Sequence, residues 1–404
     1  MGKNIVLVGL IYDNNLGDLA IFQSTKRMLS EILKENNVTN IEIRDMDMTG
    51  RISLENNPYM RSFQYRIRRK ICKSFSSNYF QNRLKLYESR DICFKVCKNY
   101  IDHNTAAIIF TGGGLIKYKC QFLHNYIDTI TKYAEKLGIP VMISGAGVEG
   151  YDENNKDCLI LKRALNRSCV KYITTRDDID TLSKYYCTNK QIIAKVADPA
   201  CSLNSVYIKQ KNKDFAGGVR RIGLGVVREG LFVDNDIEFD KQQMLDFWKS
   251  MYESIIEKGY QCKLFCNGAR SDEAFALELL DYMNIEKEQR EKIICRRPIS
   301  VENLVDLILD FDAVIVGRLH ASIIAYAYGI PSLGLVWNDK QIMFGETIGY
   351  PERFIKKEDF NVENIISHLE VAVTQGYDEI NREKYIMSTS IYLEKFLKEY
   401  VIIR

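Results

Sequence analysis

The sequence is built from short, continuous apolar runs that alternate with longer stretches of helical periodicity. Asn4–Leu10 is such a run and is followed by a helical pattern over Leu19–Glu35, while Ala106–Phe110 ends at a glycine triplet. Uninterrupted apolar strands separated by helices are typical of a parallel sheet covered on both faces. Further strands are expected at Ile41–Arg44, Val141–Ile143, Val170–Thr174 and Ile192–Val196. The pattern therefore predicts an α/β fold.

The same alternation starts again after a polar segment, Lys209–Gly218, which ends in two glycines and which we interpret as a linker. With 404 residues the chain is too long for one hydrophobic core. We expect two Rossmann-like domains, residues 1–208 and 219–376, followed by a helical segment, 377–404. Strands of the second half are expected at Ile222–Val227, Cys262–Cys266, Ile293–Cys295, Ala313–Val316 and Ser332–Val336.

Residues 59–98 depart from this pattern because they carry eleven lysines and arginines against two acidic residues, Glu88 and Asp91, with aromatic side chains between them. We expect a basic helical insertion there. It is either a solvated surface or one that meets an anionic membrane or a lipid-linked acceptor. The net charge of +3 is too small to indicate nucleic acid as a partner.

The first apolar run is too short for a signal peptide, and none is long enough to span a bilayer. We therefore expect a cytoplasmic protein, with residues 59–98 able to reach the inner face of the membrane. The eleven cysteines form no CxxC pair and no Cys/His cluster with zinc spacing. We expect reduced, buried thiols and no metal site.

Glycines and polar residues follow the strands of the first half. The first loop contains Asn15 and Asp18, and Asp18 could cap the next helix or line a site. Gly113 and Gly114 belong to a triplet whose backbone N–H groups could hold an anion or a sugar, and Ser144–Gly147 is similar. Each could be a plain tight turn, but three at successive strand ends indicate one wall of a cleft.

Two charged residues follow later strands of the same half. Arg176 comes where its guanidinium could bind a phosphate or carboxylate in bidentate fashion. The alternative is an ion pair at a helix end. Asp198, just before Pro199, could accept from a sugar hydroxyl or could be a turn residue.

The most informative stretch runs from residue 314 to 340. An apolar strand ends in Gly317-Arg318-Leu319-His320, and a helix follows at once. The carboxyl end of a strand and the N-terminus of a helix both favour an anion. His320 is one of four histidines and the one that lies in such a setting, so we interpret it as functional. Lys340 could add another positive charge.

Taken in order, these motifs resemble the polysaccharide pyruvyl transferase family over about residues 4–350. The matching segments are NLGD at 15–18, TGGG at 111–114, Gly145–Gly147, TRDD at 175–178, ADPA at 197–200, GRLHASIIAYAYGIP at 317–331, and Lys340. The GRLH…GIP block is the specific part. The resemblance implies a GT-B-like fold, with two Rossmann-like domains facing a central cleft and a final helix packing back on the first domain.

The resemblance also implies phosphoenolpyruvate as the donor substrate, no cofactor, and a pyruvate ketal on a cell-surface or exported glycan or its lipid-linked precursor. By position, Arg176, Arg318 and His320 match the donor-binding and catalytic set, and Lys340 matches a lysine often present there. Arginines and a lysine suit the carboxylate and phosphate of the donor. His320 could be the general acid or could hold the phosphate. The likeness is weaker over residues 50–105, which leaves the acceptor open.

Two other functions are weighed against this one. Many glycosyltransferases that use nucleotide sugars have a glutamate in the pattern E-A-x-x-x-G-x-P, where it can hold the ribose. Here Ile324 stands at that position, and an aliphatic side chain cannot accept from ribose hydroxyls. A non-catalytic glycan-binding protein would not need Arg176, Arg318 and His320 together.

Overall fold

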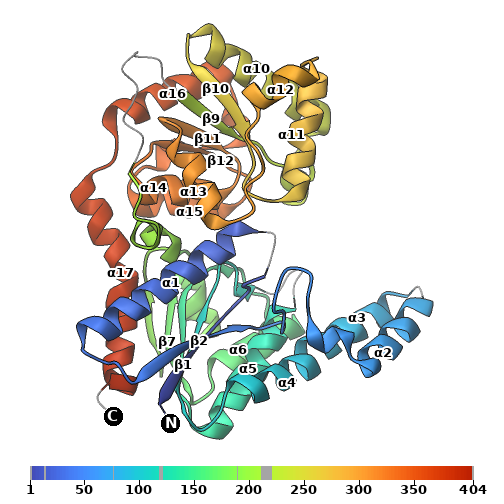
Figure 1. The fold of residues 1–404 in the computed structure, drawn as a ribbon, viewed down its shortest axis with the longest axis vertical. Helices are drawn as coiled ribbons and strands as arrows, with labels where there is room; N and C mark the ends of the chain where they lie inside the picture. Colours follow the sequence, from blue (N-terminus) through green and yellow to red (C-terminus); the bar gives the residue numbers. More distant parts are fainter. Residues whose placement is uncertain are drawn as a thin grey trace. The chain divides into compact units, whose positions relative to one another are not determined.

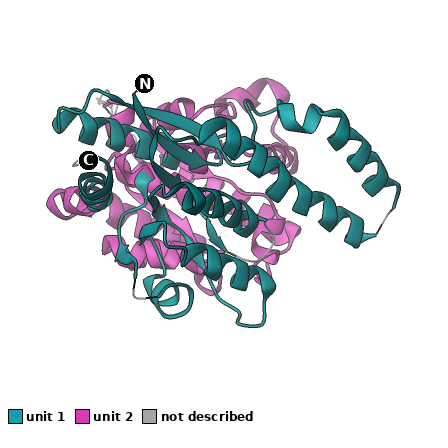
Figure 2. Cartoon of the chain, turned by 90° about the horizontal axis from the view of Figure 1, so that it is seen from below, with its two compact units in different colours: residues 1–13, 21–199, 387–404 teal, residues 14–20, 200–386 magenta. Residues whose placement is uncertain are grey.

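The computed structural model describes residues 2–12, 15–75, 77–117, 122–188, 190–210 and 221–402. The chain forms two compact units (Figure 2), one of residues 1–13, 21–199 and 387–404 and the other of residues 14–20 and 200–386. Each unit contains its own sheet of parallel strands, which confirms the α/β prediction. The second unit includes residues 14–20 and 200–208, which were expected in the first. The expected linker, beyond residue 210, lies outside the described residues.

The first unit contains a sheet of six strands in which all neighbours are parallel (Figure 1). Across the sheet they are β2 (Ile41–Asp47), β1 (Lys3–Gly9), β3 (Thr105–Thr111), β5 (Val141–Ala146), β7 (Val170–Thr175) and β8 (Ile192–Lys195). Ile5 pairs with Ile43 on one side and with Ala107 on the other. The strand order therefore reverses at β1, and the carboxyl ends of β1 and β3 form the topological switch point of this sheet.

Alternate residues of the strands point to opposite faces of this sheet. Ile5 and Leu7 of β1 belong to a core cluster that includes residues of α1 (Leu16–Glu35) and α17 (Glu379–Leu397). Val6 and Val8 belong to a second cluster on the other face. That cluster contains residues of α4 (Cys93–Tyr100), α5 (Leu123–Leu137) and α6 (Lys156–Leu165). Burial on both faces explains why these strands read as uninterrupted apolar runs.

The last helix contributes directly to the core of the first unit. Leu393, Phe396 and Leu397 recur at helical spacing and are fully buried. They pack with strand residues of the first face, and the hydroxyl of Tyr172 on β7 donates to Glu399 Oε2 at 2.8 Å. The chain therefore closes the first sheet with residues from its other end.

Residues 59–98 are helical over most of their length. Ser62 caps α2 (Phe63–Ser74), its hydroxyl accepting from the backbone N–H of Tyr65 at 3.3 Å. α2 is followed by α3 (Asn78–Tyr87) and a π-helical turn that leads into α4. The residues of α4 that face the sheet are buried, whereas α2 and α3 have mostly exposed side chains. The basic surface is therefore the α2–α3 hairpin, residues 63–87.

The second unit contains a sheet of five strands, all parallel. Across the sheet they are β10 (Gln261–Phe265), β9 (Arg221–Gly225), β11 (Ala313–Val316), β12 (Ser332–Leu335) and β13 (Phe354–Ile355). The helices of this unit include α10 (Lys241–Glu257), α11 (Arg270–Tyr282), α13 (Val301–Leu309), α14 (Leu319–Ala327), α15 (Asp339–Ile348) and α16 (Val362–Gln375). The strand order reverses at β9, so the switch point lies at the carboxyl ends of β9 and β11.

The strand predicted at Ile293–Cys295 is wrong. Helix α12 (Lys287–Ile293) covers its first residue, and Ile294 forms a single bridge with Leu264. The apolar run is only three residues long and follows directly on a charged helix, so it is too short to continue the sheet. Strand β13 has only two residues, which is too short to give a strand signal in the sequence, and it was not predicted.

None of the helices in the described residues combines the length and the apolar composition that a membrane span requires.

The cysteines of the described residues are free thiols, and most are buried. Burial raises the pKa of Cys169 and of Cys295 to about 11 and that of Cys187 to about 12. These thiols stay protonated in the folded protein at pH 8, and the thiolate is the reactive form. No group of three or more metal-ligating side chains occurs in the described ranges.

We expect iodoacetamide at pH 8 to modify Cys169, Cys187 and Cys295 much more slowly in the folded protein than in urea, as mass spectrometry of the peptides would report. Burial raises the pKa of these thiols in the folded protein, so below about pH 9 they do not lower the free energy of unfolding. As the pH rises from about 9 toward 11, the free energy of unfolding falls. Metal analysis should find no stoichiometric zinc. Equal labelling rates in the folded and unfolded protein would contradict the burial argument.

Candidate active site

The motif with the most specific sequence signal lies at the switch point of the second sheet. Gly317 follows β11, and its N–H donates to the carbonyl of Gly225, the last residue of β9, at 3.0 Å. A Cβ atom at Gly317 would lie 2.6 Å from Val227 Cγ1. Glycine thus allows the loops after β9 and β11 to approach closely. In sheets of this kind ligands bind at this point, beyond the carboxyl ends of the strands.

Arg318 is held in place by a carboxylate that sequence reasoning missed. Its Nε and Nη2 donate to Asp272 Oδ2 and Oδ1, both at 2.8 Å. Asp272 lies in the first turn of α11, is fully buried, and also accepts from the N–H of Arg228 at 3.1 Å. It therefore ties together the loops that follow β9, β10 and β11. The Arg318 side chain is 26% exposed, and a guanidinium has five N–H donors, so it can still donate to an anion.

His320 is the second residue of α14 and is half-buried. Its ring packs directly on Gly17, because a Cβ atom there would lie 2.4 Å from both Cγ and Nδ1 of the imidazole. The preceding Leu16 packs closely on Gly268, where a Cβ atom would lie 2.7 Å from the leucine side chain. These two contacts explain why residues 14–20 belong to the second unit. Gly17 thus supports the imidazole of His320.

Asn15 and Asp18 shape the turn that carries Gly17. Asn15 Oδ1 accepts from the N–H of Gly17 at 3.2 Å, and its Nδ2 donates to Asp18 Oδ2 at 3.0 Å. Because α1 begins at Leu16, Asp18 lies inside the first turn and is not the capping residue. Near a helix N-terminus its charge is favourable. The structure therefore brings Asn15, Asp18 and His320 into one neighbourhood, through Gly17.

Lys340 is the second residue of α15 and is half-buried. The turn before it is fixed by its neighbour Gln341, which is fully buried and whose Oε1 accepts from the N–H of Trp337 at 2.9 Å. Gln341 Nε2 donates to the carbonyls of Leu335 at 2.9 Å and Gly317 at 3.3 Å. The start of α15 is thereby tied to the turn that carries Arg318 and His320.

The first unit joins two of the three turns that were predicted to form one wall, those after β3 and β5, while the turn at residues 15–18 belongs to the second unit. The N–H of Gly147 donates to the carbonyl of Gly113 at 2.5 Å, so the turns after β3 and β5 are bonded to each other. Gly145 has φ 60°, and a Cβ atom there would lie 2.7 Å from the ring of Pro199. Gly113 is buried rather than exposed, while Gly114 is half-buried. The accessible backbone of this turn is therefore at Gly114.

Arg176 has a carboxylate partner within its own unit. Its Nη1 donates to Asp198 Oδ2, and its Nε lies 3.8 Å from Asp177 Oδ2. The side chains of Arg176 and Asp198 are 6% and 1% exposed. Asp177 Oδ1 in turn accepts from the N–H of Val148 at 2.7 Å. The structure thus joins Arg176 to Asp198 in a buried pair, close to the ion-pair alternative that the sequence left open.

A family model described as polysaccharide pyruvyl transferase matches residues 15–339. The chain belongs to the polysaccharide pyruvyl transferase family. The match begins at Asn15 and ends one residue before Lys340. It therefore includes the loops after β3, β5, β7 and β8 of the first unit and the Arg318–His320 turn of this family member. No curated protein matches the sequence.

Solved structures show the fold. The UDP-GlcNAc 2-epimerase from Methanocaldococcus jannaschii is 14% identical, has a TM-score of 0.58, and is matched over 98% of this chain and 99% of that chain. A putative UDP-N-acetylglucosamine 2-epimerase from Listeria monocytogenes is 11% identical, with a TM-score of 0.57 and coverage of 99% and 97%. A glycosyltransferase from Rickettsia africae ESF-5 is 13% identical, with a TM-score of 0.50 and coverage of 100% and 99%. The chain therefore has the predicted GT-B-type fold.

Proposed function

We propose that this protein transfers the pyruvyl group of phosphoenolpyruvate to two hydroxyls of one sugar in a cell-surface or exported glycan, or in its lipid-linked precursor. One observation carries the proposal within the family. His320 is supported on Gly17, two residues from an Arg318 that Asp272 holds in bidentate fashion, at the switch point of the second sheet. A pre-oriented guanidinium and an imidazole at a helix N-terminus suit an anionic donor.

The reaction needs a proton donor and fixed positive charge. In the first step the donor's methylene carbon gains a proton while a sugar hydroxyl oxygen bonds to the adjacent carbon and loses its own proton. In the second step a neighbouring hydroxyl oxygen bonds to that carbon, inorganic phosphate leaves together with the hydroxyl proton, and the cyclic ketal closes. Arg318 and Lys340 would stabilise the carboxylate and phosphate charges in both steps. His320 would supply the proton or hold the phosphate.

In this proposal Arg176 does not contact the donor. Its guanidinium is buried against Asp198, so it would hold the loops after β7 and β8 in shape rather than bind the donor. Gly114 is the more accessible glycine of its turn and would be the one to present backbone N–H to a ligand. Asn15 and Asp18 would act by keeping Gly17 under His320.

The nucleotide-sugar alternative is disfavoured by Ile324. This residue stands where the glycosyltransferase pattern has its glutamate, and it is fully buried in the helix that begins at the His320 turn. It offers no acceptor for a ribose hydroxyl. A phosphate-release assay with phosphoenolpyruvate and a panel of glycan acceptors tests the proposal, with mass spectrometry of the pyruvylated product. Turnover that requires a nucleotide sugar and ignores phosphoenolpyruvate would support the alternative.

Substituting Arg318→Lys keeps the charge but removes the planar fork. Charge-assisted hydrogen bonds contribute roughly 1.5–3 kcal/mol, so we expect KM for phosphoenolpyruvate to rise about tenfold or more. Steady-state kinetics measures the change. The matched control is Arg290→Lys, because Arg290 pairs with Asp281 of the same helix, α11, is 23% exposed, and is not in the proposed site. A parental KM in the Arg318→Lys enzyme would exclude Arg318 from donor binding.

A further inference from the structure

The charge of the α2–α3 hairpin differs from that of the rest of the chain. Residues 63–87 contain no aspartate or glutamate. Their basic residues are Arg66, Arg68, Arg69, Lys70, Lys73, Arg83 and Lys85. Because the whole chain has a net charge of +3 and the hairpin one of +7, the remaining residues together carry −4. Attraction to an anionic surface would therefore be local to the hairpin.

The same hairpin exposes large apolar side chains. Phe63, Ile67 and Ile71 follow one another at four-residue spacing on α2, so they form one stripe along the helix. Phe63 is 77% exposed and Ile71 52%. Phe75 and Tyr79, at the turn between the helices, are exposed as well. Single exposed apolar residues are common, but a contiguous stripe indicates an interaction surface.

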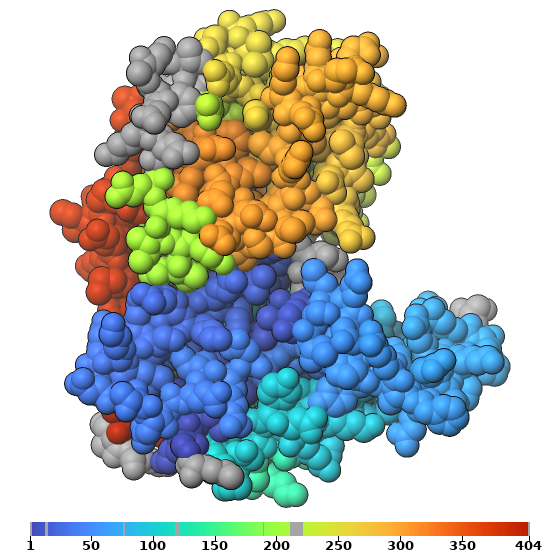
Figure 3. All heavy atoms as spheres, in the orientation of Figure 1, coloured from blue at the N-terminus to red at the C-terminus, as the bar shows by residue number. Residues whose placement is uncertain are grey.

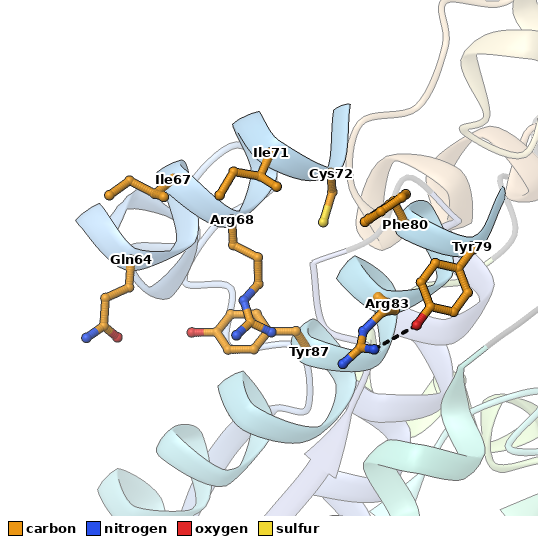
Figure 4. A pocket seen from close by; sticks show the side chains of 9 residues that line it. All are labelled: Gln64, Ile67, Arg68, Ile71, Cys72, Tyr79, Phe80, Arg83 and Tyr87. Atoms are coloured by element: carbon orange, nitrogen blue, oxygen red, sulfur yellow. Dashed lines mark hydrogen bonds between the residues drawn. The ribbon is translucent and has the colours of Figure 1, made fainter. Parts of the chain in front are cut away.

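A groove of about 720 Å³ lies between the two helices (Figure 4). It is lined by Gln64, Ile67, Arg68, Ile71, Cys72, Tyr79, Phe80, Arg83 and Tyr87. The guanidinium of Arg68 lies 4.0 Å from the ring centre of Tyr87, and Arg83 Nη1 donates to the Tyr79 hydroxyl at 2.8 Å. Cationic groups are thus held beside apolar walls. The hairpin is light blue in Figure 3, where its side chains form part of the surface of the first unit.

We propose that the α2–α3 hairpin docks on an anionic lipid bilayer. The stripe of Phe63, Ile67 and Ile71 enters the boundary between headgroups and acyl chains, and the lysines and arginines bind lipid phosphates. A bilayer matches both features of this surface, its exclusively positive charge and its exposed apolar side chains. Nucleic acid would match the charge and its bases could stack on exposed rings, but it would leave Ile67 and Ile71 in water. The inference does not depend on pyruvyl transfer.

The test is co-sedimentation of the full-length protein with vesicles of phosphatidylcholine alone and with vesicles that also contain phosphatidylglycerol. We expect at least about tenfold stronger binding to the anionic vesicles, weakening as salt is raised. The variant with Arg66, Arg69, Lys70 and Lys73 changed to Gln should lose most of this binding. A triple variant, Phe63→Ser, Ile67→Ser and Ile71→Ser, should also bind more weakly.

Matched controls change the same number of exposed residues in the second unit. For charge they are Lys263, Lys287, Lys292 and Arg296 changed to Gln, and for apolar surface Val233, Ile299 and Ile380 changed to Ser. Both controls should bind anionic vesicles like the parent, and phosphate release with a water-soluble acceptor should be unchanged in all variants. Equal binding by parent and hairpin variants would overturn the proposal, as would retention on nucleic acid or an acidic protein without any vesicle binding.

A second measurement uses the parent protein alone, in case a variant fails to fold. Amide exchange of residues 63–87 should slow when anionic vesicles are added, while exchange elsewhere in the first unit stays the same. Exchange that is unchanged in the hairpin would overturn the proposal. Loss of pyruvyl transfer with vesicle binding intact would contradict the proposed function and leave the docking surface standing.

Discussion

Replacing His320 by alanine is expected to lower turnover roughly a hundred-fold to ten-thousand-fold, the range for a lost general acid. The substitution removes the imidazole but leaves Arg318 on Asp272 and the start of α15 on Gln341. The measurement is kcat and KM for phosphoenolpyruvate by phosphate release. His368→Ala is the control, since that histidine is exposed on α16.

The same kcat and KM values tell whether His320 is the general acid or a phosphate ligand. If the imidazole is the acid, kcat falls and donor affinity changes little, whereas a phosphate ligand lowers both. Gly17→Ala should reproduce much of the loss, because its Cβ atom would displace the ring it now supports. The control is Gly138→Ala. Gly138 has a left-handed backbone, but an added Cβ atom would meet no other atom within 4 Å, so turnover should not change. Near-parental turnover and affinity in His320→Ala would remove this residue from the mechanism.

Replacing Arg176 by methionine is expected to destabilise the first unit by about 3–5 kcal/mol, because the Asp198 carboxylate would be left buried without its partner. Amide exchange of β7 and β8 during urea denaturation measures this locally, which is needed since two units need not unfold together. Exchange in the second sheet is the internal control.

A second substitution tells a structural role from donor binding. Adding Asp198→Leu to Arg176→Met removes both charges, and an apolar pair of similar volume is often as stable as a buried ion pair. We expect the double variant to recover most of the lost stability. If Arg176→Met unfolds at the parental urea concentration, the pair does not stabilise the unit, and the predicted contact of Arg176 with the donor would regain support.

The strands were predictable where burial leaves a long local signal. β1, β3 and β11 have apolar side chains on both faces of a sheet, so each reads as a continuous run in the sequence. The run at Ile293–Cys295 has similar composition but makes only one bridge. Ile294 does reach the edge strand β10, but helix α12 continues through Ile293 and leaves too few residues for a ladder. Local composition does not report how far the preceding helix continues.

The site was predictable only where its residues are neighbours in the sequence. Arg318 and His320 stand in a motif of adjacent residues, but Asp272 reaches Arg318 across 46 positions of sequence. Gln341 likewise acts on Gly317 from a different strand end. Such partners follow from the order of strands in the sheet. The imidazole of His320 likewise packs on Gly17, which lies near the other end of the sequence.

The contribution of α17 to the first core has a consequence during protein synthesis. β8 leaves the ribosome about 200 residues before Leu393, Phe396 and Leu397, which at 5–20 residues per second is a delay of roughly 10–40 s. Throughout that interval Tyr172 lacks the ring of Phe396 on which it packs in the folded protein, and the cluster that contains Ile5 and Leu7 lacks its residues from α17. The nascent N-terminal half must therefore wait with one face of its sheet incompletely covered, exposed to chaperones and to other nascent chains, until Leu393, Phe396 and Leu397 have been synthesised.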